Sequence, residues 1–520
     1  MDYVWTVSFR PELVVPHSKM LPQNSLFDLL PRQTASDLEP APNVPHEIVR
    51  EQARFLTTIN DFDDDLRSRF EKNLVLDRSL TRQLVSFQAN KQRAAYRWFK
   101  YKEAFSAQLV DFLLSRYGIQ KGTILDPFCG AGTALFVAAD AGLNADGIEL
   151  LPIGQEIVRA RQRIRKLQPE HFARLKVWLN SQIWARQEKS VCLPELRITE
   201  GAYPAQTVDQ IERYLSSAST ESAELQEILR FSLLCVLENV SYTRKDGQYL
   251  RWDHRSGRKQ GAKIFDKGEI IPFNAAIHSK IAEVLSDFSS GNVSADLFSK
   301  GADVGRVELL PGSCLDILPQ LKSGSYSAIF TSPPYCNRYD YTRTYALELA
   351  VLGVNETELS RLRQEMLSCT VENRVKDLIS LNPAWKDAIE NAEQQPLLQA
   401  LLRYLEWCRS ASLLNNNGIA RMVRGYFYEM ACVIAECRRV LRPGGTLIMV
   451  NDNVRYAGAS ISVDLIFSSL AERLGFKVEN ILVLPNGKGN SSQQMGAHGR
   501  DALRKCVYIW KKAQRRTADT

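Results

Sequence analysis

One segment constrains the fold of this chain more than any other: an apolar strand that runs into a glycine turn and then into a helix. Residues 123–126 are typical of a strand, Gly130 and Gly132 form the turn, and residues 134–139 continue with a helical apolar pattern. A second strand pattern follows at residues 144–150. Strand and helix patterns that alternate in this way are typical of a parallel sheet. The sequence therefore predicts an α/β protein.

The glycine turn also predicts a ligand site. Glycines let the backbone approach a ligand closely. Glu149 lies about 20 residues beyond the turn, where nucleotide-binding folds place the acceptor of ribose hydroxyls. No Gly-Lys-Ser/Thr follows the turn, and the third glycine of the dinucleotide fingerprint is missing. These features favour a cofactor that carries a ribose but no phosphates.

A second motif, Thr-Ser-Pro-Pro-Tyr at residues 331–335, follows another apolar strand pattern. Pro333 and Pro334 fix the backbone and remove two N–H donors, while their carbonyls still accept hydrogen bonds. Ser332 Oγ and the Pro333 carbonyl could therefore take both hydrogens of an amino group, and Tyr335 could stack on the ring that carries it. The alternative interpretation is a plain proline-rich turn after a strand. We expect Cys336, one step beyond the turn, to be a small apolar filler.

Together, Asp-Pro-Phe-Cys-Gly-Ala-Gly-Thr at residues 126–133 and the proline turn resemble the amino-methyltransferases of DNA. These enzymes methylate cytosine N4 or adenine N6 with S-adenosylmethionine. Residues 101–110 resemble the cofactor-contacting segment of that family, and residues 438–447 resemble the helix–turn–strand of class I methyltransferases. The resemblance covers residues 95–165 and 305–350, and more weakly 415–512.

The resemblance implies a class I methyltransferase fold, with a Rossmann-like sheet of seven strands, and double-stranded DNA as substrate. It implies that the target base leaves the helix stack. Ser313 stands where the family often has an acid against the cofactor, and Asp316 is a possible replacement. The implied residues are Ser332, Pro333, Pro334 and Tyr335 for catalysis, and Tyr101, Phe105, Asp126, Pro127, Phe128, Gly130, Gly132, Thr133, Glu149, Ser313 and Asp316 for cofactor binding.

The serine of the proline turn favours cytosine N4, because Asp or Asn is commoner there in the adenine N6 enzymes. The order of the two motifs is not that of many cytosine N4 enzymes, so adenine N6 remains the alternative. An RNA base methyltransferase would usually show Asp-Pro-Pro-Tyr. A non-catalytic recognition subunit would not need Gly130, Gly132, Glu149 and Ser332.

The two motifs lie too far apart for a compact α/β fold, so insertions are expected. We predict a proline-rich arm and helical segment at residues 1–90, a first core part at 91–165, and an inserted helical and basic domain at 166–300 for DNA recognition. The second core part is expected at 301–520, with a further insertion at 350–415.

Basic and aromatic residues alternate in two stretches that we predict to contact DNA. The first could also be a solvated basic loop, and the second could simply begin a surface helix. The residues are Arg244, Lys245, Arg251, Arg255, Arg258 and Lys259, and then Arg338, Tyr339 and Tyr341. Lys488 and Arg500 of a glycine-rich loop are further candidates.

The bulk properties narrow the class of protein. The net charge of +7 is compatible with a nucleic-acid partner. The ten cysteines include no Cys-x-x-Cys pair, and there are only six histidines, so we expect no metal. We find neither a membrane-spanning run nor a signal peptide, and expect a cytoplasmic, prokaryotic protein. The resemblance makes a cognate restriction or phage-defence system a possible partner.

Overall fold

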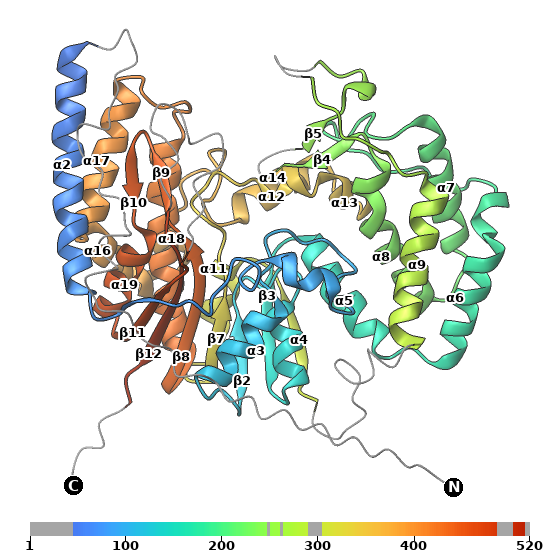
Figure 1. The fold of residues 1–520 in the computed structure, drawn as a ribbon, viewed down its shortest axis with the longest axis horizontal. Helices are drawn as coiled ribbons and strands as arrows, with labels where there is room; N and C mark the ends of the chain where they lie inside the picture. The colour runs from blue at the N-terminus through green and yellow to red at the C-terminus, as the bar shows by residue number, and fades with distance from the viewer. Residues whose placement is uncertain (1–44, 247–249, 260–263, 290–303, 486–502, 515–520) are drawn as a thin grey trace, which may run out of the picture.

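The computed structural model describes residues 45–246, 250–259, 264–289, 304–485 and 503–514. Its centre is an eight-stranded sheet in the order β1-β11-β12-β8-β7-β2-β3-β6 (Figure 1). Only β12 is antiparallel to its neighbours. The strands are β1 (Leu74–Leu76), β2 (Thr123–Asp126), β3 (Asn144–Glu149), β6 (Val307–Pro311), β7 (Tyr326–Thr331), β8 (Leu441–Asp452), β11 (Phe476–Val483) and β12 (Lys505–Lys512).

Seven of these strands form the class I methyltransferase sheet that the sequence predicts, and the antiparallel β12 lies between β11 and β8. The strands that carry the two motifs are neighbours, since Ile124 of β2 pairs with Ala328 of β7. The eighth strand, β1, was not predicted, because three apolar residues are too few to show a strand pattern. It pairs in parallel with β11 and extends that edge of the sheet.

Side chains of successive strand residues enter two hydrophobic cores, one on each face of the sheet. Ile124 and Phe330 belong to the first core, and Leu125 and Ile329 belong to the second. This is the period of two that a sheet covered on both faces requires. Helices α3 (Ala107–Arg116), α4 (Thr133–Asp140) and α5 (Pro152–Ile164) contribute to the first core, and α2 (His46–Arg69), α11 (Cys314–Ile317), α16 (Lys386–Glu393), α17 (Pro396–Ser410), α18 (Ile419–Val440) and α19 (Val463–Arg473) contribute to the second.

The first insertion is mostly helical, as the sequence indicates. Its helices are α6 (Pro169–Ser181), α7 (Ala205–Ala218), α8 (Ala223–Val240) and α9 (Phe273–Ser289). Trp178 stacks on Trp184, with 4.6 Å between the ring centroids. Both rings belong to the same hydrophobic core as the first sheet face. After α8 the chain forms a short hairpin of β4 (Thr243–Lys245) and β5 (Leu250–Trp252).

The second insertion follows the proline turn. It contains α12 (Tyr341–Thr344), α13 (Ala346–Val351), α14 (Glu356–Glu365) and α15 (Leu378–Leu381) and then leads into α16 and α17. Figure 1 shows α12, α13 and α14 above the central strands, between the α17 side of the molecule and the helical insertion. A small separate ribbon of β9 (Val454–Tyr456) and β10 (Ala459–Ile461) follows β8.

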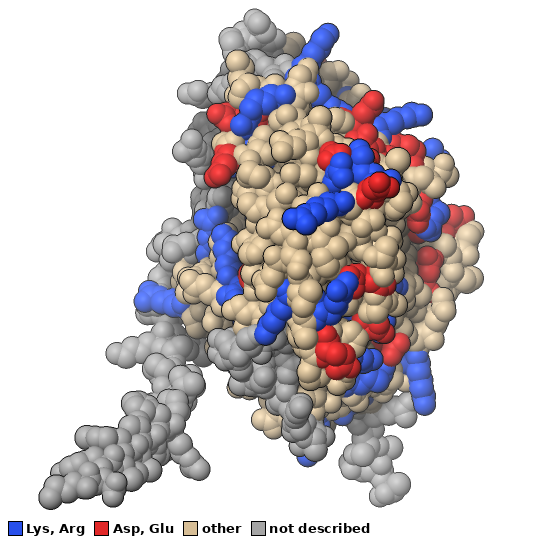
Figure 2. Space-filling model, turned by 90° about the vertical axis from the view of Figure 1, so that its right-hand side faces the viewer, with Lys and Arg blue, Asp and Glu red and all other residues tan. Residues whose placement is uncertain are grey.

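The outer face of the helical insertion carries both signs of charge. Figure 2 shows Lys and Arg interspersed with Asp and Glu over this face, with a broad uncharged area between them. This face therefore does not present a continuous positively charged surface for DNA. Among the described residues, no helix has both the length and the apolar character needed to cross a membrane. The predicted arm at residues 1–44 lies outside the described residues.

Candidate active site

The strand ends bring the two motifs to one edge of the sheet. Strand β2 ends at Asp126, β3 at Glu149, β7 at Thr331 and β8 at Asp452. The chain passes from β2 to β3 on one side, while β7 lies on the other. Open α/β sheets bind ligands at such a switch point, beyond the carboxyl ends of the strands. A cavity of ≈ 400 Å³ lies there, within the usual range for small-molecule sites.

Most of the predicted cofactor and catalytic residues line this cavity. Tyr339 and Tyr341, which we assigned to DNA contact, also line it. Asp126, Gly132 and Asp316 are not among the lining residues. The predicted residues that do line it are Tyr101, Phe105, Pro127, Phe128, Gly130, Thr133, Glu149, Ser313, Ser332, Pro333, Pro334 and Tyr335.

Glu149 is a buried carboxylate in the cavity wall, and backbone donors hold it in place. Its Oε2 accepts from Gly130 N at 2.8 Å, and its Oε1 accepts from Leu151 N at 2.7 Å. Burial raises its pKa to about 7. A Cβ on Gly154 would come within 2.8 Å of the carboxyl carbon. Each carboxylate oxygen keeps a further lone pair, so Glu149 can still accept hydrogen bonds from hydroxyls of a ligand.

Asp126 and Gly132 do not line the cavity but support the glycine loop beside it, so their contact with the cofactor stays a prediction. Asp126 is only 1% exposed and accepts from Phe128 N at 3.0 Å and from Thr331 Oγ1 at 2.7 Å. It therefore ties the glycine loop to the strand of the proline turn, and burial raises its pKa to about 7. Gly132 caps α4 with a φ of 73°, and a Cβ there would lie 2.8 Å from Val158.

Asp316, the possible replacement for the acid that Ser313 lacks, is also absent from the cavity lining. It lies on α11 outside the cavity lining, where burial raises its pKa. Ser313 does line the cavity and donates to the backbone carbonyl of Glu365 at 3.1 Å. The second insertion, through Glu365 and Met366, thus forms part of the cavity wall beside Ser313.

The proline turn presents Ser332 as an acceptor. Ser332 Oγ donates its hydrogen to the carbonyl of Val450 at 3.1 Å and lies 3.4 Å from the Tyr335 hydroxyl. Because both recorded acceptors of the Ser332 hydrogen, the Val450 carbonyl and the Tyr335 hydroxyl, belong to the protein, the hydroxyl lone pairs can accept from an amino group. Cys336 is fully buried, and burial holds the pKa of its thiol well above the usual range. It therefore does not provide a thiolate nucleophile.

Several polar residues of the cavity were missed by the sequence reasoning. Glu103 accepts from the hydroxyls of Tyr339 and Tyr345, and so ties the cavity to the start of the second insertion. Asp452 and Lys505 face the proline turn from β8 and β12. An apolar pattern marks both positions in the sequence: Asp452 follows the apolar run 447–450, and Lys505 directly precedes the apolar run 506–510.

Lys245 was wrongly predicted to contact DNA. Its side chain is buried and forms an ion pair with the buried carboxylate of Glu348 on α13. The ammonium also lies 5.1 Å from the ring centroid of Phe99 and 4.5 Å from that of Tyr345. The charge is neutralised inside the protein, so Lys245 joins the hairpin to the helix that follows the proline turn. It does not offer its charge to a phosphate.

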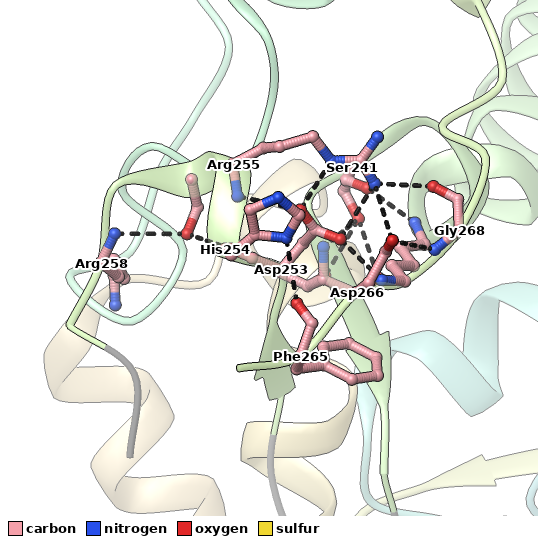
Figure 3. A network of polar contacts seen from close by, with 11 residues as sticks. Ser241, Asp253, His254, Arg255, Arg258, Phe265, Asp266 and Gly268 are labelled. Atoms are coloured by element: carbon pink, nitrogen blue, oxygen red, sulfur yellow. Dashed lines mark hydrogen bonds and ion pairs between the residues drawn. The ribbon is translucent and has the colours of Figure 1, made fainter. Parts of the chain in front are cut away.

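Two arginines of the segment after the hairpin, Arg255 and Arg258, are engaged in a polar network (Figure 3). Arg255 binds the buried carboxylate of Asp253, with Nε 2.7 Å from Oδ1, and donates to the carbonyl of Gly268 at 2.6 Å. Arg258 lies 3.7 Å from the ring centroid of Trp252 and donates to the carbonyl of Glu200 at 2.6 Å. Both arginines, which we predicted to contact DNA, therefore make their recorded contacts within the protein.

The remaining predicted DNA contacts differ in exposure. Arg244 and Arg251 both lie over the ring of Phe265, at 5.4 Å and 4.1 Å from its centroid, and Arg244 is exposed. Lys259 is exposed at the end of the described loop. Arg338 donates to the side chain of Asn415 at 2.9 Å. Lys488 and Arg500 lie outside the described residues.

One group of potential metal ligands lies in the same network. Single ligand atoms of Asp253, His254 and Asp266 come within 4.8 Å of one another. Both oxygens of Asp253 are already bound, one by Arg255 and the other by Lys267 N at 2.6 Å. The arginine holds the pKa of Asp253 well below its usual range. We therefore assign this group to the ion-pair network.

Comparison with known proteins gives close relatives over nearly the whole chain. The chain is 55% identical over 470 residues to "Type II methyltransferase M.AvaI" of Nostoc sp., which covers 90% of this chain and 97% of that protein. A protein of the same name from Anabaena variabilis has the same identity and coverage. M.BsoBI, a type II methyltransferase of Geobacillus stearothermophilus, is 38% identical over 461 residues, or 84% of this chain and 89% of that protein. No family model matches the chain.

Proposed function

The chain belongs to the type II DNA methyltransferases, and we propose that it methylates the exocyclic amino group of a flipped base, with cytosine N4 as the target. The methyl donor would be S-adenosylmethionine. The observation that carries this proposal is the state of Ser332, whose hydrogen is donated to Val450 and whose lone pairs are left to accept. An amino group is the reacting group that such a turn recognises.

The cavity fits the donor. Its walls combine apolar and aromatic side chains, among them Phe105, Phe128 and Ile148, with the buried carboxylate of Glu149 at the end of β3. Glu149 would accept from the ribose hydroxyls, and the glycine loop would pass close to the ligand. When bound, S-adenosylmethionine supplies an electrophilic methyl group on a positively charged sulfur.

The proline turn would prepare the nucleophile. The lone pair of an exocyclic amino nitrogen is delocalised into the base, which makes it a poor nucleophile. Its two hydrogens would donate to Ser332 Oγ and the Pro333 carbonyl. These hydrogen bonds favour a geometry in which the lone pair is localised on the nitrogen, which makes it a better nucleophile. Tyr335 would stack on the base and hold it out of the helix. The nitrogen would bond to the methyl carbon as the carbon–sulfur bond breaks and leaves a neutral thioether, and the released amino proton would pass to solvent. Most of the catalysis is positioning.

Serine at position 332 supports cytosine N4, and adenine N6 is the alternative. An RNA base as substrate is disfavoured by the relatives, which are all type II methyltransferases. For residues 166–300 we propose a role in DNA recognition. We further propose that the protein works in the bacterial cytoplasm with a cognate restriction nuclease or another phage-defence system. Protection of methylated DNA from such a nuclease would test that partnership.

The direct test is to identify the product. Unmethylated duplex DNA is incubated with the purified protein and S-adenosylmethionine that carries a labelled methyl group, and the DNA is digested to nucleosides for mass spectrometry. The expected product is N4-methyldeoxycytidine. N6-methyldeoxyadenosine would move the target to the alternative base, and 5-methyldeoxycytidine would contradict the amino-group proposal. RNA of the same sequence serves as the control and should stay unmethylated.

A further inference from the structure

A charged pair lies in the cavity wall beside the proline turn, and the function proposed above does not use it. Lys505 is the first residue of β12. Because β12 runs antiparallel to β8, its first residue lies at the same edge as the carboxyl end of β8, and Lys505 is paired with Asp452 in the register of the two strands. Both side chains line the cavity.

The pair directly borders the catalytic turn. Lys505 Nζ lies 3.3 Å from Asp452 Oδ1 and 5.6 Å from the centroid of the Tyr335 ring. The carbonyl that takes the hydrogen of Ser332 belongs to Val450, on the same strand as Asp452. A row of groups therefore runs along the edge of the sheet: an acceptor for an amino group, an aromatic ring and an ammonium donor.

The backbone at Lys505 is held in place from the other side of the sheet. The neighbouring Arg504 forms a buried ion pair with Asp464 of α19, with Nε 2.6 Å from Oδ2. Successive strand residues point to opposite faces, so this anchor on one face fixes the direction of the Lys505 side chain on the other. The side chain of Lys505 remains 25% exposed and lines the cavity.

We propose that Lys505, held by Asp452, donates a hydrogen bond to the ring nitrogen beside the amino group of the flipped base. This inference rests on the proposed amino-group methylation. In cytosine that nitrogen is N3, an acceptor next to the carbon that carries the amino group; in adenine it is N1. A donor at Lys505 and acceptors at the proline turn would read two adjacent positions of the Watson–Crick edge.

Asp452 has a second effect in this arrangement. The amino nitrogen becomes positively charged as the methyl arrives, and an ammonium nearby would oppose that charge. The Asp452 carboxylate keeps the pair neutral as a whole. Lys505 can therefore orient the base without a net positive charge beside the reacting nitrogen.

The test compares Lys505→Met with Lys511→Met on two substrates. Lys511 lies on the same strand, is 45% exposed and is 3.8 Å from Glu479, so it is a matched control for the loss of a lysine. One duplex carries cytosine at the target position, and the other carries 3-deazacytosine, which keeps the amino group but has C–H in place of N3. Single-turnover methylation rates are measured for each pair, with calorimetric cofactor affinity as a check on folding.

Lys505→Met is expected to slow methylation of cytosine by roughly 10- to 100-fold, as for a lost hydrogen bond from a charged donor. It should have little effect on 3-deazacytosine, while Lys511→Met behaves as the wild type on both. An equal loss on both substrates would overturn the proposal. If the product analysis identifies adenine as the target, the same comparison is made with 1-deazaadenine, so that failure of the proposed target is distinguished from failure of the Lys505 contact.

Discussion

Two buried carboxylates, Asp126 and Glu149, lie at neighbouring strand ends and have similarly raised pKa values, but they face different surroundings. Asp126 accepts from Phe128 N and Thr331 Oγ1 behind the wall of the cavity. Glu149 borders the cavity itself. Their pKa values are both raised to about 7 by burial. Only Glu149 can therefore couple its ionisation directly to a bound ligand.

We predict that the affinity for S-adenosylmethionine rises as the pH increases through about 7, because the ionised Glu149 is the stronger acceptor for ribose hydroxyls. Glu149→Gln should remove most of this pH dependence and weaken binding by about 1–3 kcal/mol, the cost of a lost hydrogen bond to a charged group. Calorimetry at several pH values measures both effects. Asp126→Asn is the control and should keep the pH dependence. If only Asp126→Asn loses the pH dependence, Asp126 and not Glu149 is the group whose ionisation controls cofactor affinity.

We predict that Ser332→Ala keeps the cofactor affinity near normal and reduces turnover, since Ser332 is proposed to act on the base. Tyr335→Ala removes a stacking surface that is worth about 1–3 kcal/mol per base. The flipped state should then be less populated, which a fluorescent base analogue at the target position reports. Full activity of the double variant would contradict the amino-methylation proposal.

At the scale of secondary-structure elements, the β4–β5 hairpin connects the helical insertion to the catalytic side. Lys245 of β4 reaches Glu348 of α13, and α13 belongs to the insertion that follows the proline turn. The loop after β5 is stabilised by Asp253, which accepts from Arg255 and from Lys267 N. Some basic residues of this segment, such as Lys245 and Arg255, are therefore paired within the protein, whereas Lys259 is exposed.

We predict that Lys259→Gln reduces the affinity for duplex DNA and lowers the slope of log affinity against log salt by about 0.9, the effect of one lost phosphate contact. Lys259 is exposed, whereas Arg255 is bound to Asp253. Arg255→Gln should instead lower the thermal stability, because it leaves a buried carboxylate without its partner. An unchanged slope for Lys259→Gln would identify a solvated loop and favour the second insertion as the DNA surface.

We predict that Lys245→Met destabilises the protein by about 3–5 kcal/mol, because Glu348 would be left as an unpaired buried charge. Both side chains are almost fully buried. Lys245→Met combined with Glu348→Leu should recover much of the loss, since a buried ion pair can be replaced by apolar side chains. Urea denaturation measures both. If the double variant instead loses the sum of the unfolding free energies lost by the two single variants, Lys245 and Glu348 do not stabilise the protein through their ion pair.

How well the sequence predicts an element depends on whether the contacts that form it lie close together or far apart along the chain. The strands β2, β7, β8 and β12 carry dense apolar patterns and end in glycine, proline or polar residues, so local rules predict them. The burial of Lys245 depends on Glu348, 103 residues away in the chain. Nothing near Lys245 in the sequence distinguishes it from the exposed Arg244. The same holds for Glu103, whose partners Tyr339 and Tyr345 come from the second insertion.

At the scale of the whole molecule, the helical insertion and the first face of the sheet share one hydrophobic core. Trp178 and Trp184 of the insertion lie in that core together with Phe136 and Ile124. Helix α8 contacts α5, which covers the sheet. An insertion that is continuous with the sheet in this way does not have the separate core that an independently folding domain would need.

We therefore predict that Trp178→Ala lowers the stability of the sheet as well as that of the insertion, by about 3–5 kcal/mol for a large buried ring. Trp510→Ala in β12 is the matched variant on the other side of the molecule. Urea unfolding followed by fluorescence and by far-UV circular dichroism should give coincident transitions in both variants. Two separate transitions in the Trp178→Ala variant would show that the insertion unfolds on its own.

The parallel pairing of β1 with β11 has a consequence for how the protein is made. Asn73, next to β1, donates to the carbonyl of Val478, 405 residues later in the chain. At synthesis rates of about 5–20 residues per second, the ribosome needs roughly 20–80 s to make that partner. During this time Leu74, Val75 and Leu76 have no strand to pair with. The edge of the sheet is therefore completed only near the end of translation, and the first of the described strands to leave the ribosome is among the last to be paired.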